Sequence, residues 1–133
     1  MFSINMLPFI KLMGENIAIA VSGGPDSMVL LYLMRQWVKK NNKKLIAYTF
    51  NHNLREESLK EALFVKSYCH EIFIEHKIIN WTEDKPISGL QKKAREARYL
   101  LINNYCIKDK VNILFTAHHA DDLAETVAMR IFN

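Results

Sequence analysis

Short runs of apolar, often β-branched residues alternate along the chain with longer stretches in which apolar residues recur every three or four positions. The short runs are typical of strands and the longer ones of helices. This pattern predicts strands at residues 16–21, 44–50, 75–81 and 111–117, and helices at residues 26–40, 57–72, 90–110 and 121–132.

Strict alternation of strand and helix predicts an α/β fold, an open, doubly wound parallel sheet with helices on both faces. We expect the strand order 3-2-1-4. No repeat or linker divides the chain, so residues 1–133 are interpreted as one domain. Four strands make a small sheet, and the last predicted helix runs to the end without Gly or Pro, so we expect the fold to be truncated.

Composition narrows the class of protein. Half of the residues are hydrophobic and 24% are charged, which is typical of a globular domain, and the net charge of +4 suits an anionic partner such as nucleotide or RNA without requiring one. The first residues, with Pro8 and Lys11, do not resemble a signal peptide, and no apolar run approaches the roughly 20 residues of a membrane span. We therefore expect a cytoplasmic protein without a membrane partner, and we expect Cys69 and Cys106 to be core residues.

The stretch SGGPDS, residues 22–27, follows the first predicted strand and holds two of the four glycines of the chain. Two glycines before a helix can form a nest of backbone N–H groups that suits phosphate. Pro25 fits a first helical turn, and Asp26 or Ser27 could cap it. A plain tight turn is the alternative interpretation.

Two further strand ends are polar, and ligands of open α/β sheets bind beyond the carboxyl ends of the strands. The second strand is followed by NHN with His52, and the fourth by a group of five ionisable residues, His118, His119, Asp121, Asp122 and Glu125. Asp122 and Glu125 would share a helical face and suit Mg²⁺, whereas a zinc site or ordinary helix-start chemistry remain alternatives.

Basic residues mark the third predicted helix, in the segment QKKAREARY. A solvated helix face explains most of them, although an arginine turned toward the strand ends could neutralise phosphate. We expect His70 and His76 to be surface residues without a role.

These motifs resemble a known family. SGGPDS resembles the signature of the PP-loop ATP pyrophosphatase superfamily, which has a Rossmann-like fold of the adenine nucleotide alpha hydrolase type. The segments NHNLREES, AREARY and TAHHADDLAETVAMR resemble the bacterial tRNA(Ile)-lysidine synthetases, and the resemblance runs from residue 17 to the end of the chain.

The resemblance implies a ligase that uses ATP and Mg²⁺ to join L-lysine to carbon 2 of the wobble cytidine of tRNA(Ile) with a CAU anticodon. An adenylated tRNA would form, with release of AMP and pyrophosphate, and a homodimer is left open. Leu123 replaces a glutamine common in relatives. Because an Arg-Gly segment and the C-terminal tRNA-binding domains are missing from these residues, we expect the 133-residue chain alone to be inactive.

The resemblance also implies roles for individual residues. The phosphates would lie against Ser22, Gly23, Gly24, Pro25, Asp26 and Ser27, and the nucleotide would lie near His52 and His118. Mg²⁺ would be held by Asp26 and Asp122. The catalytic residues would be Asp26, Arg98, Asp122 and Glu125.

Three other functions stay open at this point. A related PP-loop tRNA thiolase would need a cysteine pair near the site. A non-catalytic ATP-binding module would bind ATP without turnover. A metal-dependent hydrolase would use His118, His119 and Asp122.

Overall fold

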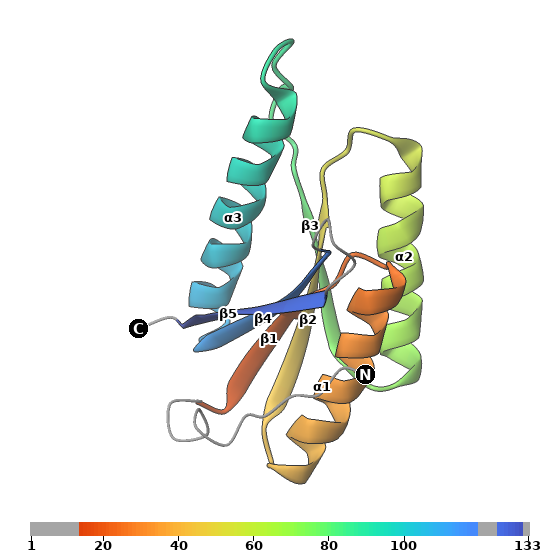
Figure 1. Cartoon of the computed structure of the whole chain (residues 1–133), viewed down its shortest axis with the longest axis vertical. Coiled ribbons are helices and arrows are strands. Elements are labelled where there is room, and N and C mark those ends of the chain that lie inside the picture. The colour runs from red at the N-terminus through yellow and green to blue at the C-terminus, as the bar shows by residue number, and fades with distance from the viewer. Residues whose placement is uncertain (1–13, 120–124, 132–133) are drawn as a thin grey trace.

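Five strands form one sheet in the order β3-β2-β1-β4-β5 (Figure 1). The computed structural model describes residues 14–119 and 125–131. The elements follow the chain in the order β1 (Asn16–Ala20), α1 (Pro25–Lys40), β2 (Lys44–Asn51), α2 (Glu56–Glu71), β3 (Glu75–Asn80), α3 (Leu90–Lys108), β4 (Ile113–His119) and β5 (Glu125–Ile131).

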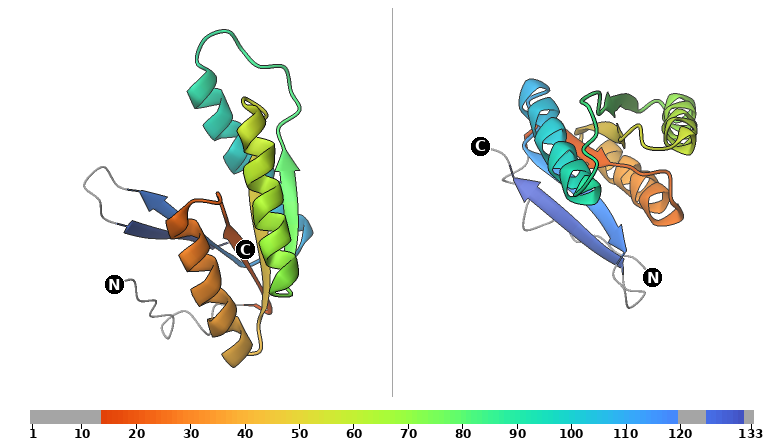
Figure 2. Two further views of the ribbon diagram at one scale, coloured as in Figure 1. Left: turned by 90° about the vertical axis from the view of Figure 1, so that its right-hand side faces the viewer. Right: turned by 90° about the horizontal axis from the view of Figure 1, so that it is seen from above.

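The first four strands confirm the predicted fold. β1 pairs in parallel with β2 and with β4, and β2 pairs in parallel with β3, which gives the expected order 3-2-1-4. Helices α1 and α2 cover one face of this sheet and α3 covers the other (Figure 2). The boundaries of these seven elements lie within two residues of those predicted from the sequence.

Each face of the sheet carries its own hydrophobic core, because side chains alternate between the faces along a strand. Ile17 and Ile19 of β1 pack with Leu30, Met34 and other residues in the core between the sheet and helices α1 and α2. Ala18 and Ala20 face the opposite way and pack with Tyr48, Ile102 and Cys106 in the core between the sheet and α3. Burial of both faces explains why the central strands are apolar runs without polar alternation.

The predicted fourth helix is wrong over residues 125–131. These residues form β5, which pairs antiparallel with β4 at the edge of the sheet, with Thr116 opposite Ala128. The segment ETVAMRI alternates Val127, Met129 and Ile131 with smaller or polar residues, a period of two that fits a strand as well as a helix. Pairing with the free edge of β4 decides between the two. Residues 120–124 lie outside the described part.

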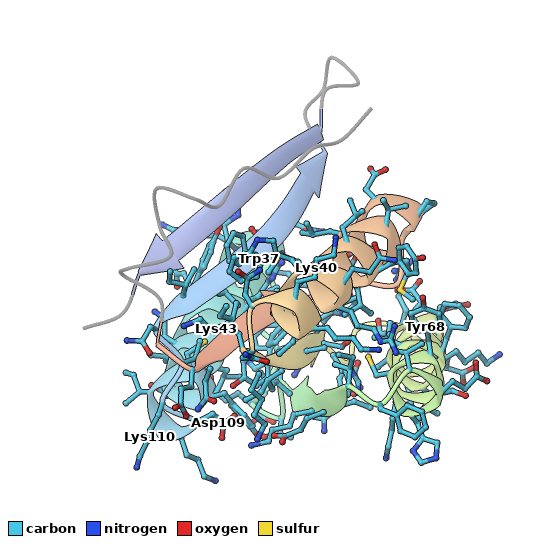
Figure 3. All side chains as sticks on the ribbon, turned by 90° about the horizontal axis from the view of Figure 1, so that it is seen from below. Trp37, Lys40, Lys43, Tyr68, Asp109 and Lys110 are labelled. Atoms are coloured by element: carbon cyan, nitrogen blue, oxygen red, sulfur yellow. The ribbon has the colours of Figure 1, made fainter. Side chains whose placement is uncertain are left out.

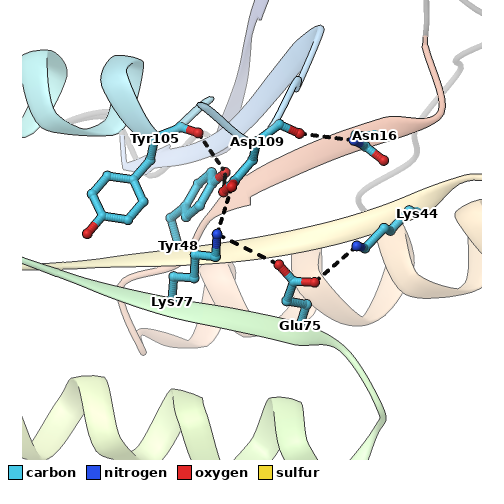
Figure 4. A network of polar contacts seen from close by, with 7 residues as sticks. All are labelled: Asn16, Lys44, Tyr48, Glu75, Lys77, Tyr105 and Asp109. Carbon is cyan, nitrogen blue, oxygen red and sulfur yellow. Dashed lines mark hydrogen bonds and ion pairs between the residues drawn. The ribbon is translucent and has the colours of Figure 1, made fainter. Parts of the chain in front are cut away.

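A polar network ties the amino end of the sheet to the end of α3 (Figure 4). The carboxylate of Asp109 accepts hydrogen bonds from Tyr48 at 2.6 Å and from Lys77 at 2.7 Å, and its backbone carbonyl accepts one from Asn16 at 3.0 Å. Lys77 also lies 4.0 Å from Glu75. Burial opposes the charged form of Asp109, but the two hydrogen bonds to the carboxylate together with the charges of Lys77 and Lys108 lower its pKa.

Lysines gather at this amino end, where Figure 3 shows Lys40, Lys43 and Lys110 beside the ends of the helices. Lys39 and Lys40 occupy the last turn of α1 and Lys108 the last turn of α3. Cations at these positions compensate the negative end of a helix dipole. The ligand site therefore has to be sought at the other end of the sheet.

Candidate nucleotide site

The loop between β1 and α1 has a backbone that needs glycine at one position. Gly23 has φ of +86°, a conformation that L side chains rarely adopt. The N–H of Ser22 donates to Oγ of Ser27 at 2.9 Å, so Ser27 holds the loop closed. The expected cap by Asp26 or Ser27 is wrong, because Gly24 is the N-cap and no side chain bonds there; Pro25 occupies the first turn as expected.

Gly24 has no such conformational need. Its φ is −71°, and a Cβ at this position would meet only Ser22 Oγ, at an ordinary 3.5 Å. The described part of the chain therefore leaves room for a side chain at Gly24. A glycine there keeps the backbone accessible at the positive end of α1, where an anion can approach N–H groups closely.

A cavity of about 170 Å³ opens at the carboxyl ends of β1 and β2, between α2 and α3. Ser22, His52 and Arg98 line it, although they come from three separate segments. Ser58, Glu61 and Tyr48 also line it. The structure thus brings a loop residue, a histidine and an arginine of the predicted site to one place.

The surroundings of His52 favour the neutral form of its imidazole ring. Its Nδ1 accepts a hydrogen bond from the N–H of Leu54 at 3.1 Å, and the hydroxyl of Ser58 lies 3.3 Å from the ring nitrogens. Burial, followed by the positive charge of Arg55, lowers the pKa of His52. A neutral ring that offers N–H at Nε2 can contact a base or a ribose without adding charge.

Arg98 supplies the positive charge of the cavity. Among the described residues no hydrogen bond or ion pair holds its guanidinium. Glu61 lines the same cavity from α2, so the lining is not purely cationic. An arginine with free donors suits a polyphosphate, which it can bind through two parallel hydrogen bonds.

Sequence reasoning missed Ser58 and Glu61. They lie three residues apart at the start of α2 and so share the helical face that meets the end of β2. The signal that could have found them is this spacing, read together with His52 at the preceding strand end.

The remaining predicted residues are only partly placed. His118 belongs to the end of β4 and lies opposite Thr126 in the register, and Glu125 begins β5 opposite His119. Because Glu125 is in a strand, the expected helical face shared with Asp122 is wrong. Asp122 itself, like Asp121 and Leu123, lies outside the described residues. Asp26 lies in the first turn of α1, beside the loop.

No group of three or more metal-ligating side chains occurs in residues 14–119 and 125–131. Asp26 alone suits Mg²⁺ rather than zinc, because Mg²⁺ is commonly bound through one or two carboxylates together with substrate phosphates and water. None of the helices in this described part is long and apolar enough to cross a membrane.

Two side-chain expectations have clear outcomes. Cys69 and Cys106 are buried core residues, as expected, and burial raises the pKa of Cys69 to about 11. His76 is not an ordinary surface residue: its Nε2 lies 2.8 Å from Oγ1 of Thr49, and burial followed by the charge of Lys66 lowers its pKa to about 4. His70 is exposed, as expected.

The chain is similar to curated proteins named tRNA(Ile)-lysidine synthase. It is 49% identical over 119 residues to the protein of Wolbachia pipientis wMel, covering 88% of this chain and 28% of the relative. It is 40% identical to that of Rickettsia rickettsii strain Sheila Smith, covering 88% and 24%. The chain therefore spans about a quarter of the length of these relatives.

Among solved structures, the U34-tRNA thiolase NcsA of Methanococcus maripaludis, with its [4Fe-4S] cluster, has a similar fold. The TM-score is 0.70 at 24% identity, over 80% of this chain and 41% of the thiolase. The family model described as PP-loop domain matches residues 3–133. Since that match takes in nearly every residue, and the glycine loop and the sheet order agree with it, the chain belongs to the PP-loop domain family.

Proposed function

We propose that this chain is the ATP-binding part of an enzyme that ligates lysine to carbon 2 of the wobble cytidine of tRNA(Ile) with a CAU anticodon. The observation that carries the proposal is the cavity at the ends of β1 and β2, where Ser22, His52 and Arg98 meet. The similarity to proteins named tRNA(Ile)-lysidine synthase over 88% of the chain supports the choice of substrate.

The reaction has two steps. Oxygen 2 of the cytidine attacks the α-phosphorus of ATP, the bond to the bridging oxygen breaks, and pyrophosphate leaves. The amino group of lysine then attacks carbon 2 and loses a proton, while AMP departs with the former oxygen 2. Adenylation is needed because the carbonyl oxygen is a poor leaving group and AMP is a good one.

In this proposal the phosphates lie on the backbone of residues 22–27 at the positive end of α1. Arg98 neutralises charge as pyrophosphate leaves, and neutral His52, with His118, contacts the nucleoside. Asp26 and Asp122 would hold Mg²⁺, which would shield the phosphate charge when bound. Asp122 and Glu125 act near the reacting base.

The cysteines give no support to a thiolase. Cys69 belongs to the core below α2 and Cys106 to the core below α3, on opposite faces of the sheet, and both side chains are buried. Two thiols separated by a sheet cannot act on one substrate. The likeness to the thiolase structure is one of fold.

Calorimetry of Mg·ATP on this chain tests the binding half of the proposal. We expect Arg98→Ala to weaken ATP binding about 10- to 100-fold, the usual worth of a charge-assisted hydrogen bond. Lys93→Ala, which changes a lysine paired with Glu96 on the same helix, is the matched control and should leave the affinity unchanged. Equal affinity of Arg98→Ala and wild type would place the phosphates elsewhere.

The ligation half needs the protein as the cell makes it, with ATP, lysine and the tRNA. AMP should appear only when all three are present, and Asp26→Asn and Glu125→Gln should abolish lysidine with near-normal thermal melting. ATP binding without AMP formation would indicate a binding module. AMP formation independent of lysine would indicate another modification of tRNA.

A further inference from the structure

A second hollow adjoins the nucleotide cavity. This groove, of about 660 Å³, lies between the end of β2 and the amino-terminal half of α3, and six of its lining residues matter here: Phe50, His52, Lys92, Arg95, Arg98 and Tyr99. Phe50, His52 and Arg98 also line the nucleotide cavity, so the two hollows adjoin at these residues. We call it the α3 groove.

The α3 groove is cationic. Lys92, Arg95 and Arg98 follow one another at intervals of three residues, which places them on neighbouring turns of one helical face. Among the residues that the structure describes, no acidic residue lines the groove and none of these three basic residues forms an ion pair. Lys93 in contrast lies 3.8 Å from Glu96 and does not line the groove.

The placement of this charge opposes helix stability. α1 begins with Asp26 and α2 with Glu56 and Glu57, as the positive end of a helix dipole favours. α3 has no acid in its first turn and places Lys92 there instead. The dipole and the side chains thus add to one positive field, which folding alone does not call for and which a polyanion would neutralise.

Packing below α3 does not explain these residues either. The buried side chains of α3, Ile102 and Cys106, both lie in its second half. Figures 1 and 2 show the first half projecting beyond the carboxyl ends of the strands, and Arg98 of this helix lines the nucleotide cavity. Tyr99, about half exposed, adds an aromatic ring to the groove, and cations interleaved with aromatic rings are typical of surfaces that bind single-stranded nucleic acid.

We infer that the α3 groove binds the single-stranded RNA that delivers the reacting base, with Lys92 and Arg95 on its phosphates and Tyr99 against a base. The inference rests on the proposed function, because it assigns the groove to the RNA substrate of that same site. Because the groove adjoins the cavity at Arg98, a base held in the groove would lie next to the site proposed for the phosphates of ATP. Lys92 and Arg95 act here as positioning residues.

The test measures binding of an anticodon stem-loop of the isoleucine tRNA to the protein as the cell makes it, by fluorescence anisotropy over a range of salt concentrations. Each neutralised phosphate of a single strand contributes about 0.7 to the slope of log affinity against log salt. The double variant Lys92→Ala/Arg95→Ala should therefore reduce the magnitude of the slope by about 1.4 and weaken binding severalfold. Arg95→Lys should keep the slope, and Lys93→Ala should change neither quantity.

The affinity for Mg·ATP, measured on the same variants, should stay at the wild-type value. An unchanged RNA affinity and slope in the double variant, no RNA binding by the wild type, or an equal loss of ATP binding would each overturn the inference. Failure of the proposed function looks different: RNA binding through the groove with no lysine-dependent AMP release would refute the ligase and leave the RNA path standing.

Discussion

At the scale of the residue, the two adjacent glycines have different reasons to be glycine. Gly23 has a backbone conformation that other residues adopt only with strain, whereas Gly24 lies in an ordinary extended conformation with room for a Cβ. The first glycine is therefore explained by the folded chain. The described part of the chain does not require the second, and a glycine there would allow the close approach of phosphate that the proposed function calls for.

Alanine substitutions separate these two roles. We expect Gly23→Ala to lower the free energy of unfolding by about 1–2 kcal/mol, the usual cost of a left-handed conformation for an L residue. Gly24→Ala should leave stability near the wild-type value, and Gly24→Val, with a bulkier side chain, should weaken ATP binding. Denaturant unfolding and calorimetry measure the two effects. A Gly24→Val variant that binds ATP normally would contradict the close approach of phosphate.

At the scale of the element, Asp109 connects four elements that only the fold brings together. Its carboxylate accepts hydrogen bonds from Tyr48 of β2 and Lys77 of β3, and its carbonyl accepts one from Asn16 of β1, directly after α3 ends (Figure 4). The hydrogen bond with Asp109 raises the pKa of Lys77, while burial, together with the same carboxylate, raises that of Tyr48. The network thus fastens α3 to the sheet from the end opposite the site.

Asp109→Asn should lower the free energy of unfolding by about 1–3 kcal/mol near neutral pH, because it replaces charge-assisted hydrogen bonds by weaker ones. The folded pKa of Asp109 lies below its usual 3.8, so its contribution is complete above that pH and is lost as the pH falls through the folded value. The folded pKa of Lys77 lies above 10.5, so its contribution is lost as the pH rises through that value.

Denaturant unfolding of wild type and Asp109→Asn across this pH range checks the prediction. The difference in free energy of unfolding between the two proteins should be constant between the folded pKa values of Asp109 and Lys77 and should become smaller in acid. Tyr48→Phe, which removes an uncharged hydroxyl, should show a loss that does not follow the titration of Lys77. A difference independent of pH for Asp109→Asn would mean that its charge contributes nothing.

At the scale of the whole molecule, the same strands support both hydrophobic cores. Ile17 and Ile19 point to the α1–α2 side of the sheet, while Ala18 and Ala20 point to the α3 side. Disruption of the central strands would therefore expose both hydrophobic cores at once. Such sharing favours cooperative unfolding of both layers. It also brings Ser22 of the loop before α1 and Arg98 of α3 into the lining of one cavity.

The two cysteines report on the two layers separately. Cys69 and Cys106 are fully buried, one in each core, so both thiols should be unreactive toward an alkylating reagent in the native protein. We expect them to become reactive at the same denaturant concentration, read for each cysteine by mass spectrometry of its peptide. Reactivity of Cys106 at a lower concentration than Cys69 would show that α3 detaches on its own.

Local patterns in the sequence determined most of the elements. Apolar runs and helical periods placed seven of them within two residues, and their alternation led to the parallel sheet in the order 3-2-1-4. The motifs SGGPDS and AREARY contain Ser22 and Arg98, which line the cavity. Periodicity and turn chemistry are local properties, which is why they can be read without the fold.

Tertiary structure decided what depends on neighbours distant in the chain. Residues 125–131 fit two periods, and the free edge of β4 makes them a strand. The sequence predicts His76 at the surface, whereas its place beside Thr49 of the neighbouring strand leaves it half-buried. Likewise the cationic face of α3 lines a groove because β2 ends beside it. The pattern of charge along a helix does not indicate which other element will pack beside that helix.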